Sequence, residues 1–426
     1  MRPGARTVCV CVIFAGSLAI TPRAGAWSEL THQQLSADAL QSVKWLDRYQ
    51  SLKVTPFKAM VQDVLGSSPA PGPEAFNFKD AATRQQKRDA YLQSTSSIGD
   101  PSVRKLARHL LLSNQLKFDF PLGEKGRTVS AREILTGYSG EPDWGMDKGL
   151  DVSRHQKLMG GTDPKQTSSQ GFRHMSFLLG KMGEAPKRAQ LFFDLGAKAI
   201  EKGHEYWGFR FTAMGLHYIE DMGTPVHTNM LPTLKYIRLK GMIRPRGTDG
   251  KRHFNKHLLG DLVKGSAQIN ANYHFLYEHA VDKAYTAGDA RAKTLSAAVQ
   301  GDGKKPNLLQ RLFTPRSVAS VAKRRAWSRL STPGIARRAV RYFTGKFRQP
   351  AAGAPESSVG SVNAAIVKDT VATADRRMAG ESQRTYNRRI SSRDGMMRST
   401  TRQFRKTGVA VRQAMGLLGK RIGATR

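Results

Sequence analysis

The stretch Tyr206–His227 reads YWGFRFTAMGLHYIEDMGTPVH. Its apolar residues recur at three- and four-residue steps and many are aromatic, which is typical of a helix buried in a protein core. Gly223 and Pro225 predict the end of that helix and a turn of the chain. The stretch therefore predicts a central core helix followed by a sharp change of direction.

The regions on either side predict further helices. Leu106–Leu116 and Ala189–Ile200 show the same spacing, whereas the two-residue alternation of amphipathic strands is scarce. Gly, Pro and Ser residues at 136–171 and at 228–252 predict two loops. We therefore expect an all-α, multi-helix domain over residues 27–345.

Residues 1–26 have the three parts of a secretory signal peptide. Arg2 and Arg6 precede the apolar run Val8–Ile20, and Ala24-Gly25-Ala26 supplies small residues for cleavage before Trp27. The only cysteines, Cys9 and Cys11, lie inside this segment. We expect a secreted or periplasmic protein without thiols, so a metal site would have to use His, Asp, Glu and backbone groups.

The C-terminal part of the chain is strongly basic. The formal net charge is +36, and residues 301–426 hold 28 Lys and Arg against 6 Asp and Glu. A Pro-, Ala-, Gly- and Ser-rich stretch at 349–362 predicts a linker. We expect residues 346–426 to form a solvated basic extension, partly helical or disordered. The charge predicts attraction to polyanions, either nucleic acid or anionic lipid.

The quoted stretch also carries candidate metal ligands. His217 and Asp221 are four residues apart, so on a helix both side chains lie on one face. The turn at Pro225 brings His227 back toward the same point. Imidazole and carboxylate groups are what zinc accepts when thiolates are absent. Near the expected mature amino terminus, Trp27 and His32 can add an α-amino group, a carbonyl oxygen and another imidazole.

Trp27-(x)4-His32 together with His217-Tyr-Ile-Glu-Asp221-(x)3-Pro225-Val-His227 resembles the zinc-dependent phospholipase C family, and is similar to the single-strand-specific zinc nucleases that share its fold. The resemblance covers roughly residues 27–345. It implies an all-α domain with three zinc ions in a cleft and hydrolysis of phosphodiesters by zinc-activated water. The expected ligands are Trp27, His32, Asp143, His174, His217, Asp221, His227, His257 and Asp261.

The resemblance also assigns these ligands to sites. Trp27 and His32 would share one ion with Asp221, which would bridge to a second ion held by His217, Asp143 and His174. In the family an Asp at the position matched by Asp143 is also proposed as general base. Competing residues for this second ion are Asp147, Asp151 and His155.

His227 would hold the third ion with a His and a carboxylate on a later helix. We choose His257 with Asp261 because this pair supplies a carboxylate, whereas the overlapping reading, His253 with His257, lacks one. His109, His204, His274 and His279 show no partner pattern and are expected to be ordinary histidines.

Phospholipid at a membrane surface is the expected substrate, with no protein partner implied. Trp144 follows Asp143 where the phospholipases place an aromatic residue that lines the headgroup pocket. A zinc nuclease acting on nucleic acid is the alternative, and a non-catalytic basic binding protein is a second alternative.

Overall fold

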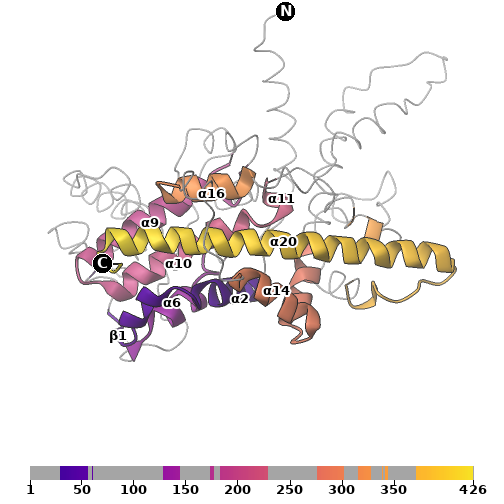
Figure 1. The fold of residues 1–426 in the computed structure, drawn as a ribbon, viewed down its shortest axis with the longest axis horizontal. Helices are drawn as coiled ribbons and strands as arrows, with labels where there is room; N and C mark the ends of the chain where they lie inside the picture. The colour runs from indigo at the N-terminus through magenta and orange to yellow at the C-terminus, as the bar shows by residue number, and fades with distance from the viewer. Residues whose placement is uncertain are drawn as a thin grey trace, which may run out of the picture.

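The computed structural model describes residues 29–55, 60, 128–143, 173–176, 183–228, 276–301, 315–327, 338, 341–343 and 371–425. Helices account for 74% of these residues, and the two short strands β1 (Leu52–Lys53) and β2 (Thr128–Val129) pair antiparallel. The prediction of an all-α fold is therefore confirmed (Figure 1). The expected signal peptide, the helix at Leu106–Leu116 and the linker at 349–362 lie outside the described residues.

The helices of the fold follow one another along the chain with these bounds: α2 (Glu29–Leu40), the 3₁₀ helix η1 (Lys44–Arg48), α6 (Ala131–Gly137), α9 (Ala185–Glu201), α10 (Glu205–Asp221), α11 (Pro225–Thr228), α14 (Ala290–Gln300), α16 (Val318–Trp327) and α20 (Gln383–Arg421). Residues 276–286 are also helical.

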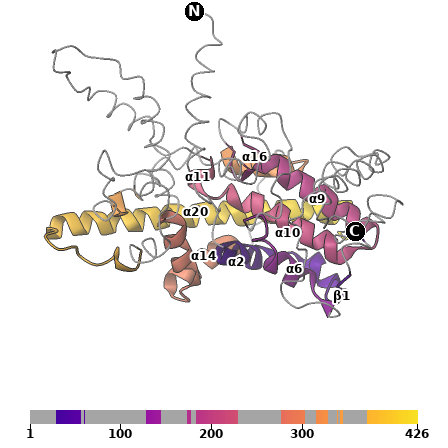
Figure 2. The ribbon, with the colours of Figure 1, turned by 180° about the vertical axis from the view of Figure 1, so that it is seen from behind.

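Helix α10 is the centre of the fold, as its composition predicts. Every residue from Tyr206 to Asp221 is buried. It packs against α9, where Gly196 lies close to the Gly208 carbonyl, 2.7 Å from the point where a Cβ atom on Gly196 would stand. Two helices can approach this closely only where side chains are absent. Figure 2 shows α9 and α10 side by side.

The helix ends where the sequence predicts. The Gly223 N–H donates to the Glu220 carbonyl at 2.7 Å and the Thr224 N–H donates to the Asp221 carbonyl at 2.9 Å. Pro225 then begins α11, whose first backbone nitrogen needs no hydrogen-bond partner. The chain therefore reverses within a few residues, and this turn follows directly after Asp221.

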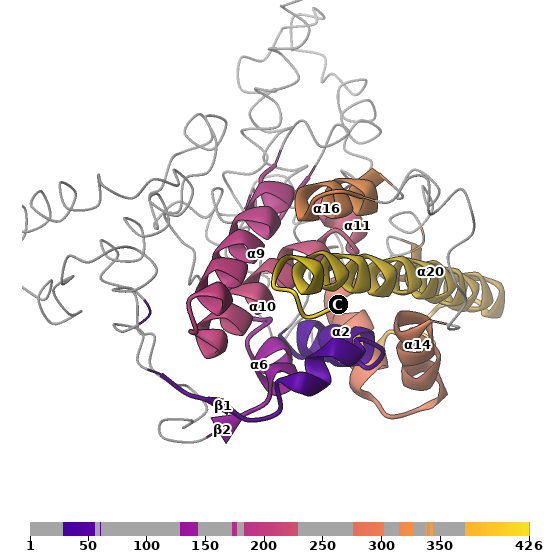
Figure 3. The ribbon, with the colours of Figure 1, turned by 60° about the vertical axis from the view of Figure 1, so that its left-hand side comes forward.

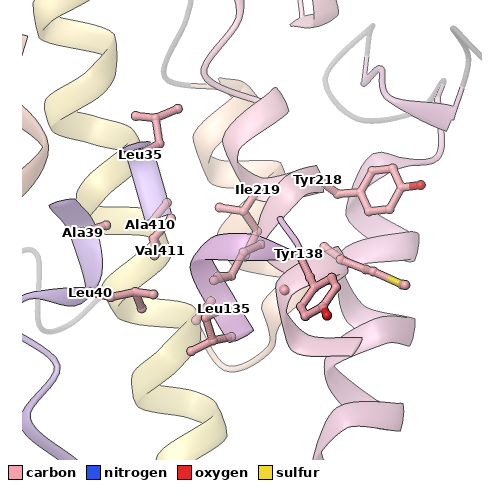
Figure 4. Packing of buried hydrophobic residues seen from close by; sticks show 14 of the residues in the cluster. Leu35, Ala39, Leu40, Leu135, Tyr138, Tyr218, Ile219, Ala410 and Val411 are labelled. Atoms are coloured by element: carbon pink, nitrogen blue, oxygen red, sulfur yellow. The ribbon is translucent and has the colours of Figure 1, made fainter. Parts of the chain in front are cut away.

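Helices α2 and α6 cover one side of α10, and α20 joins them. Figure 4 shows Leu35 and Leu40 of α2, Leu135 of α6, Ile219 of α10 and Val411 of α20 in one buried cluster. Helix α6 begins with a capping box, because the Ser130 side chain accepts from the Glu133 N–H while the Glu133 side chain accepts from the Ser130 N–H.

The expectation of a solvated C-terminal extension is wrong for α20. This 39-residue helix runs along α10, α2 and α14 and between α16 and α2 (Figures 1 and 3). Its buried residues include Phe404, Val411, Met415 and Leu418, which belong to the same core cluster as the α10 residues. Many of its other buried residues are Gly, Ala, Ser or Thr, so the sequence of this helix has only a weak hydrophobic pattern. None of the helices in the described part of the chain has the combination of length and hydrophobicity that a membrane span requires.

Candidate metal centre

Five different parts of the chain bring polar side chains to the end of α10. His217 and Asp221 come from α10 itself, one helical turn apart. His32 comes from α2, Asp143 follows α6, His174 lies in the segment 173–176, and His227 lies in α11. All six residues were expected ligands, and the fold brings all six together.

The Asp221 carboxylate is the centre of this group. Its Oδ2 atom lies 2.9 Å from His174 Nδ1 and 3.3 Å from His217 Nε2. Its Oδ1 atom lies 3.4 Å from His227 Nδ1 and 3.7 Å from His32 Nε2. Each oxygen therefore faces a different pair of imidazoles, which is the arrangement of a carboxylate that can join two cations.

Asp143 completes one half of the group. Its Oδ1 atom lies 3.6 Å from His217 Nε2 and 4.0 Å from His174 Nδ1. Donor atoms of Asp143, His174 and His217 all lie within 4.8 Å of one another, and so do those of His32, His217 and Asp221. Both sets are compact enough to hold a metal ion. The structure thus shows buried His and Asp groups with the geometry of metal ligands.

Hydrogen bonds fix which nitrogen of two imidazoles faces the centre. His32 Nδ1 lies 2.7 Å from Glu220 Oε2, and Ser36 Oγ donates to the other Glu220 oxygen at 2.7 Å. His217 Nδ1 lies 2.8 Å from the Ser139 carbonyl, to which it donates. Both rings consequently present Nε2 to the centre. Metal-binding histidines usually have such a carboxylate or carbonyl partner on the far nitrogen.

Backbone and ionic contacts hold the ligands that do not lie on long helices. The Ser176 N–H donates to the His227 carbonyl at 2.8 Å, which joins the segment of His174 to α11. Arg210 Nε of α10 donates to Glu141 Oε1 at 3.1 Å, and both side chains are buried. Glu141 is two residues before Asp143, so this buried ion pair fixes the chain that carries Asp143 to α10.

The ionisation states of His32, His174 and Asp221 favour the binding of a cation. Burial lowers the pKa of His32 well below its usual value and that of His174 to about 3, so both rings are neutral. Burial raises the pKa of Asp221, but His217, His227 and His174 together hold it well below its usual value, so it is ionised. Neutral imidazole and ionised carboxylate are the forms that bind metal.

His217 is the exception in the metal-free protein. Burial lowers its pKa, but Asp221 and Asp143 outweigh burial and raise the pKa to about 9. The ring therefore carries a proton at neutral pH and supplies one positive charge between two carboxylates. A metal ion at this place would replace that proton.

Three buried polar atoms of the centre test whether a metal fits. Among the described residues, His32 Nε2, His174 Nε2 and Asp221 Oδ1 have no hydrogen-bond partner. Leaving a buried polar atom unsatisfied costs about 1–3 kcal/mol. Two of these atoms, His32 Nε2 and Asp221 Oδ1, face each other at 3.7 Å, and a bound cation would satisfy both. The donor set, nitrogen and oxygen without sulfur, fits zinc.

The structure adds a carboxylate that our reading of the sequence missed. Glu278 is buried, and its Oε1 atom lies 3.7 Å from His227 Nε2. Glu278 follows His274 by four residues, the same spacing as His217 and Asp221, so the sequence did hold a signal for it. Glu220, the hydrogen-bond partner of His32, was also missed because it looked like one more acidic residue in the α10 motif.

Four expected site residues, Trp27, Trp144, His257 and Asp261, lie outside the described residues, as do the competitors Asp147, Asp151, His155 and His253. Comparison of the chain with protein-family models, with characterised proteins and with solved structures finds no match in any of the three.

Proposed function

We propose that this chain is an exported zinc-dependent phosphodiesterase of the phospholipase C type. The observation that carries the proposal is the buried Asp221 carboxylate, whose two oxygens face two separate pairs of imidazoles. A lone buried His–Asp pair would serve the fold alone. Four imidazoles and a second carboxylate around one carboxylate form a ligand set for more than one cation.

The ligands divide into three groups. Asp143, His174, His217 and Asp221 Oδ2 would hold one ion, and His32 with Asp221 Oδ1 would hold a second, completed by the amino nitrogen and carbonyl of Trp27. His227 and Glu278 would begin the third group, completed by residues outside the described part of the chain, where the sequence offers His257 with Asp261 or His274. When bound, zinc ions supply fixed positive charge for phosphoryl oxygens and generate a nucleophile from water near neutral pH.

The chain's own residues have separate tasks in this reaction. Asp221 fixes the two halves of the centre relative to each other. Asp143 is the most accessible carboxylate of the two central groups, with a side chain 13% exposed, whereas the Asp221 side chain is fully buried. Asp143 can therefore meet water or substrate at the edge of the centre and take up a proton as general base. Trp144, the next residue, would line the pocket for the lipid headgroup.

A zinc nuclease is the second candidate, because the net charge of +36 favours a polyanionic substrate. The same centre would serve both reactions. The substrates distinguish them, since the phospholipase releases a phosphorylated headgroup from phosphatidylcholine and the nuclease cleaves single-stranded DNA.

The test compares Asp221→Asn with Glu201→Gln in the mature protein reconstituted with zinc. Glu201 is an exposed carboxylate at the end of α9, so its variant controls for loss of one negative charge. We expect about three zinc ions per chain in the parent and the control, with release of phosphocholine. We expect Asp221→Asn to lose at least one ion and more than about 100-fold of the activity. Failure of the parent protein to bind zinc after careful reconstitution would refute the proposal.

A further inference from the structure

The basic residues of α20 divide into those that stabilise the fold and those that do not. Arg389 pairs with Glu381 at 3.0 Å and Arg393 pairs with Asp375 at 3.0 Å. Arg421 pairs with Asp194 at 2.5 Å. Arg412 donates to the Val299 carbonyl at 2.6 Å. These four side chains have a structural task that explains why they are basic.

A second set has no such task. Five arginines of α20 are exposed, and within the described part of the chain none of them pairs with a carboxylate. They are Arg384, Arg388, Arg398, Arg402 and Arg405. With 3.6 residues per turn, the five positions fall within an arc of about 100° and extend about 30 Å along the helix. The unpaired cations of α20 therefore form one line on the outer face of a straight, well-packed helix.

Arg338 fills the only long gap in this line. It donates to Ser399 Oγ at 2.8 Å, and its Nε atom stands 2.8 Å from the place where a Cβ atom on Gly395 would lie. Glycine at 395 thus lets a sixth guanidinium lie across α20 between Arg388 and Arg398. We call these six residues, Arg338, Arg384, Arg388, Arg398, Arg402 and Arg405, the arginine stripe.

Positive charge continues beside the arginine stripe. The pKa of Lys406 on α20 is lowered by partial burial and by the charges of Arg325 and Arg402. The lowered pKa of Lys406 indicates that neighbouring cations on this helix repel one another. Such an arrangement is stabilised when an anionic surface binds to it.

We propose that the arginine stripe docks the protein on an anionic phospholipid surface. This inference deepens the proposed function, because it names the surface on which a lipid substrate would be met, and it rests on that function. The five exposed guanidinium groups lie on one face of a rigid helix, so a flat bilayer can contact them together. Arginine binds phosphate oxygens through two parallel hydrogen bonds, so it suits phospholipid headgroups.

Two observations favour lipid over single-stranded nucleic acid. Proteins that bind single strands stack bases on exposed aromatic rings. The two aromatic residues of α20 do not offer such rings, because Phe404 is buried and Tyr386 is half-buried with its hydroxyl bonded to the Asp375 carbonyl. Val409, in contrast, is 44% exposed in line with the stripe and could enter the headgroup region of a bilayer.

The opposite face of α20 connects the stripe to the metal centre. Thr407 Oγ1 lies against Gly223, 2.5 Å from the place where a Cβ atom would stand. Gly223 belongs to the turn between Asp221 and His227. Docking through the stripe would therefore keep this turn about one helix diameter, roughly 10 Å, from the lipid surface.

The test measures binding to vesicles separately from hydrolysis. Zinc-free protein is sedimented with vesicles of phosphatidylcholine alone and of phosphatidylcholine mixed with phosphatidylglycerol. The stripe variant is Arg398→Gln, Arg402→Gln and Arg405→Gln combined. The matched control, Lys44→Gln, Lys53→Gln and Lys202→Gln combined, removes the same charge from exposed positions on other elements. Circular dichroism checks that both variants are folded.

We expect the parent to bind the mixed vesicles and not phosphatidylcholine alone. Each cation near an anionic membrane contributes about fivefold to binding, so the stripe variant should lose about 100-fold and the control far less. Equal losses in the two variants would overturn the proposal, because net charge alone would then explain binding. Loss of binding to single-stranded DNA, with vesicle binding unchanged, would overturn it in favour of nucleic acid.

A soluble short-chain phosphodiester separates this inference from the proposed function. The zinc-loaded stripe variant should hydrolyse this soluble substrate at the same rate as the parent protein, since the stripe does not contact the metal centre. If neither protein hydrolyses any phosphodiester but vesicle binding still depends on the stripe, the docking surface stands and the proposed function fails.

Discussion

Glu220 and Asp221 are neighbours on α10 but have different tasks in the centre. Asp221 faces the imidazoles directly, whereas Glu220 bonds the outer nitrogen of His32 and the Ser36 hydroxyl. Burial raises the pKa of Glu220 well above its usual value, and the Ser36 hydrogen bond and the charge of His217 oppose that shift. Glu220 thus orients a ligand of the centre without being one.

Replacing Glu220 with Gln should weaken zinc binding at the His32 group by about 10- to 100-fold, because an amide is a weaker acceptor than a carboxylate and its single oxygen cannot serve His32 and Ser36 as the two carboxylate oxygens do. Competition with a chromophoric chelator measures this change. The exposed Glu201→Gln variant is the control. An unchanged affinity in Glu220→Gln would show that the ring is held by packing on His217, whose ring centroid lies 4.0 Å away.

His217 gives the zinc-free protein a defined pH dependence. Its folded-state pKa of about 9 lies above the usual 6.5, so the stabilisation it provides is complete below pH 6.5 and is lost as the pH rises through 9. The loss is on the order of 3 kcal/mol. Thermal unfolding of zinc-free protein should therefore occur at lower temperature as the pH increases over this range.

Zinc binding should show the opposite trend. The metal displaces the proton of His217, so affinity should increase between pH 6.5 and 9 with release of a proton. Calorimetry in buffers of different ionisation enthalpy measures that release. A zinc affinity independent of pH over this range would contradict the assignment of His217 as a ligand.

The junction between α10 and α20 determines where the turn between Asp221 and His227 lies. A Cβ atom on Gly223 would stand 2.5 Å from Thr407 Oγ1 and 2.7 Å from the Glu220 carbonyl. Arg325 of α16 donates to the same Thr407 hydroxyl at 3.0 Å. Three helices thus meet at one glycine in the turn between Asp221 and His227.

Gly223→Ala should destabilise the protein by about 1–3 kcal/mol, because the turn or α20 must move to make room. It should also weaken zinc binding, since the turn carries His227. Gly416→Ala is the matched control, because a Cβ atom there meets nothing within 4 Å and alanine favours the helix. Denaturant unfolding and zinc titration measure both effects. Equal stability of the two variants would show that the junction is not tight.

Helix α20 is part of the same hydrophobic core as α10, which carries the metal centre. Phe404, Val411, Met415 and Leu418 are each at most 2% exposed. Burial of such a side chain contributes about 1.5–3 kcal/mol, so the four together approach the whole net stability of a typical domain. The basic C-terminal segment therefore stabilises the domain that carries the centre.

A chain that ends at residue 345 should consequently fail to reach the native state. We expect it to lack the near-ultraviolet circular dichroism signal of packed aromatic side chains. We also expect that it does not bind zinc in stoichiometric amounts. The control is a chain that keeps residues 27–426. A cooperative thermal transition in the shortened chain would contradict this prediction, because it would show that the domain folds without the basic segment.

Much of the candidate site could be predicted from local spacing. The 3.6-residue period predicts the helix and places His217 and Asp221 on one face of it. The properties of glycine and proline predict that the helix ends after Asp221. His32, Asp143 and His174 needed the resemblance, because nothing local joins residues so far apart. Glu278 was overlooked because His274, four residues before it, was expected to be an ordinary histidine.

Local patterns in the sequence therefore predict the all-α class, the buried character of α10, the pairing of His217 with Asp221 and the turn that leads to His227. These are consequences of side-chain chemistry repeated at short range. Tertiary packing, in contrast, brings His32, Asp143 and His174 to the end of α10, sets Glu220 against His32 and Glu278 beside His227, and makes α20 a core helix with one arginine face. Those features depend on which distant segments pack together, and the small buried residues of α20 carry too little hydrophobic signal to reveal that packing.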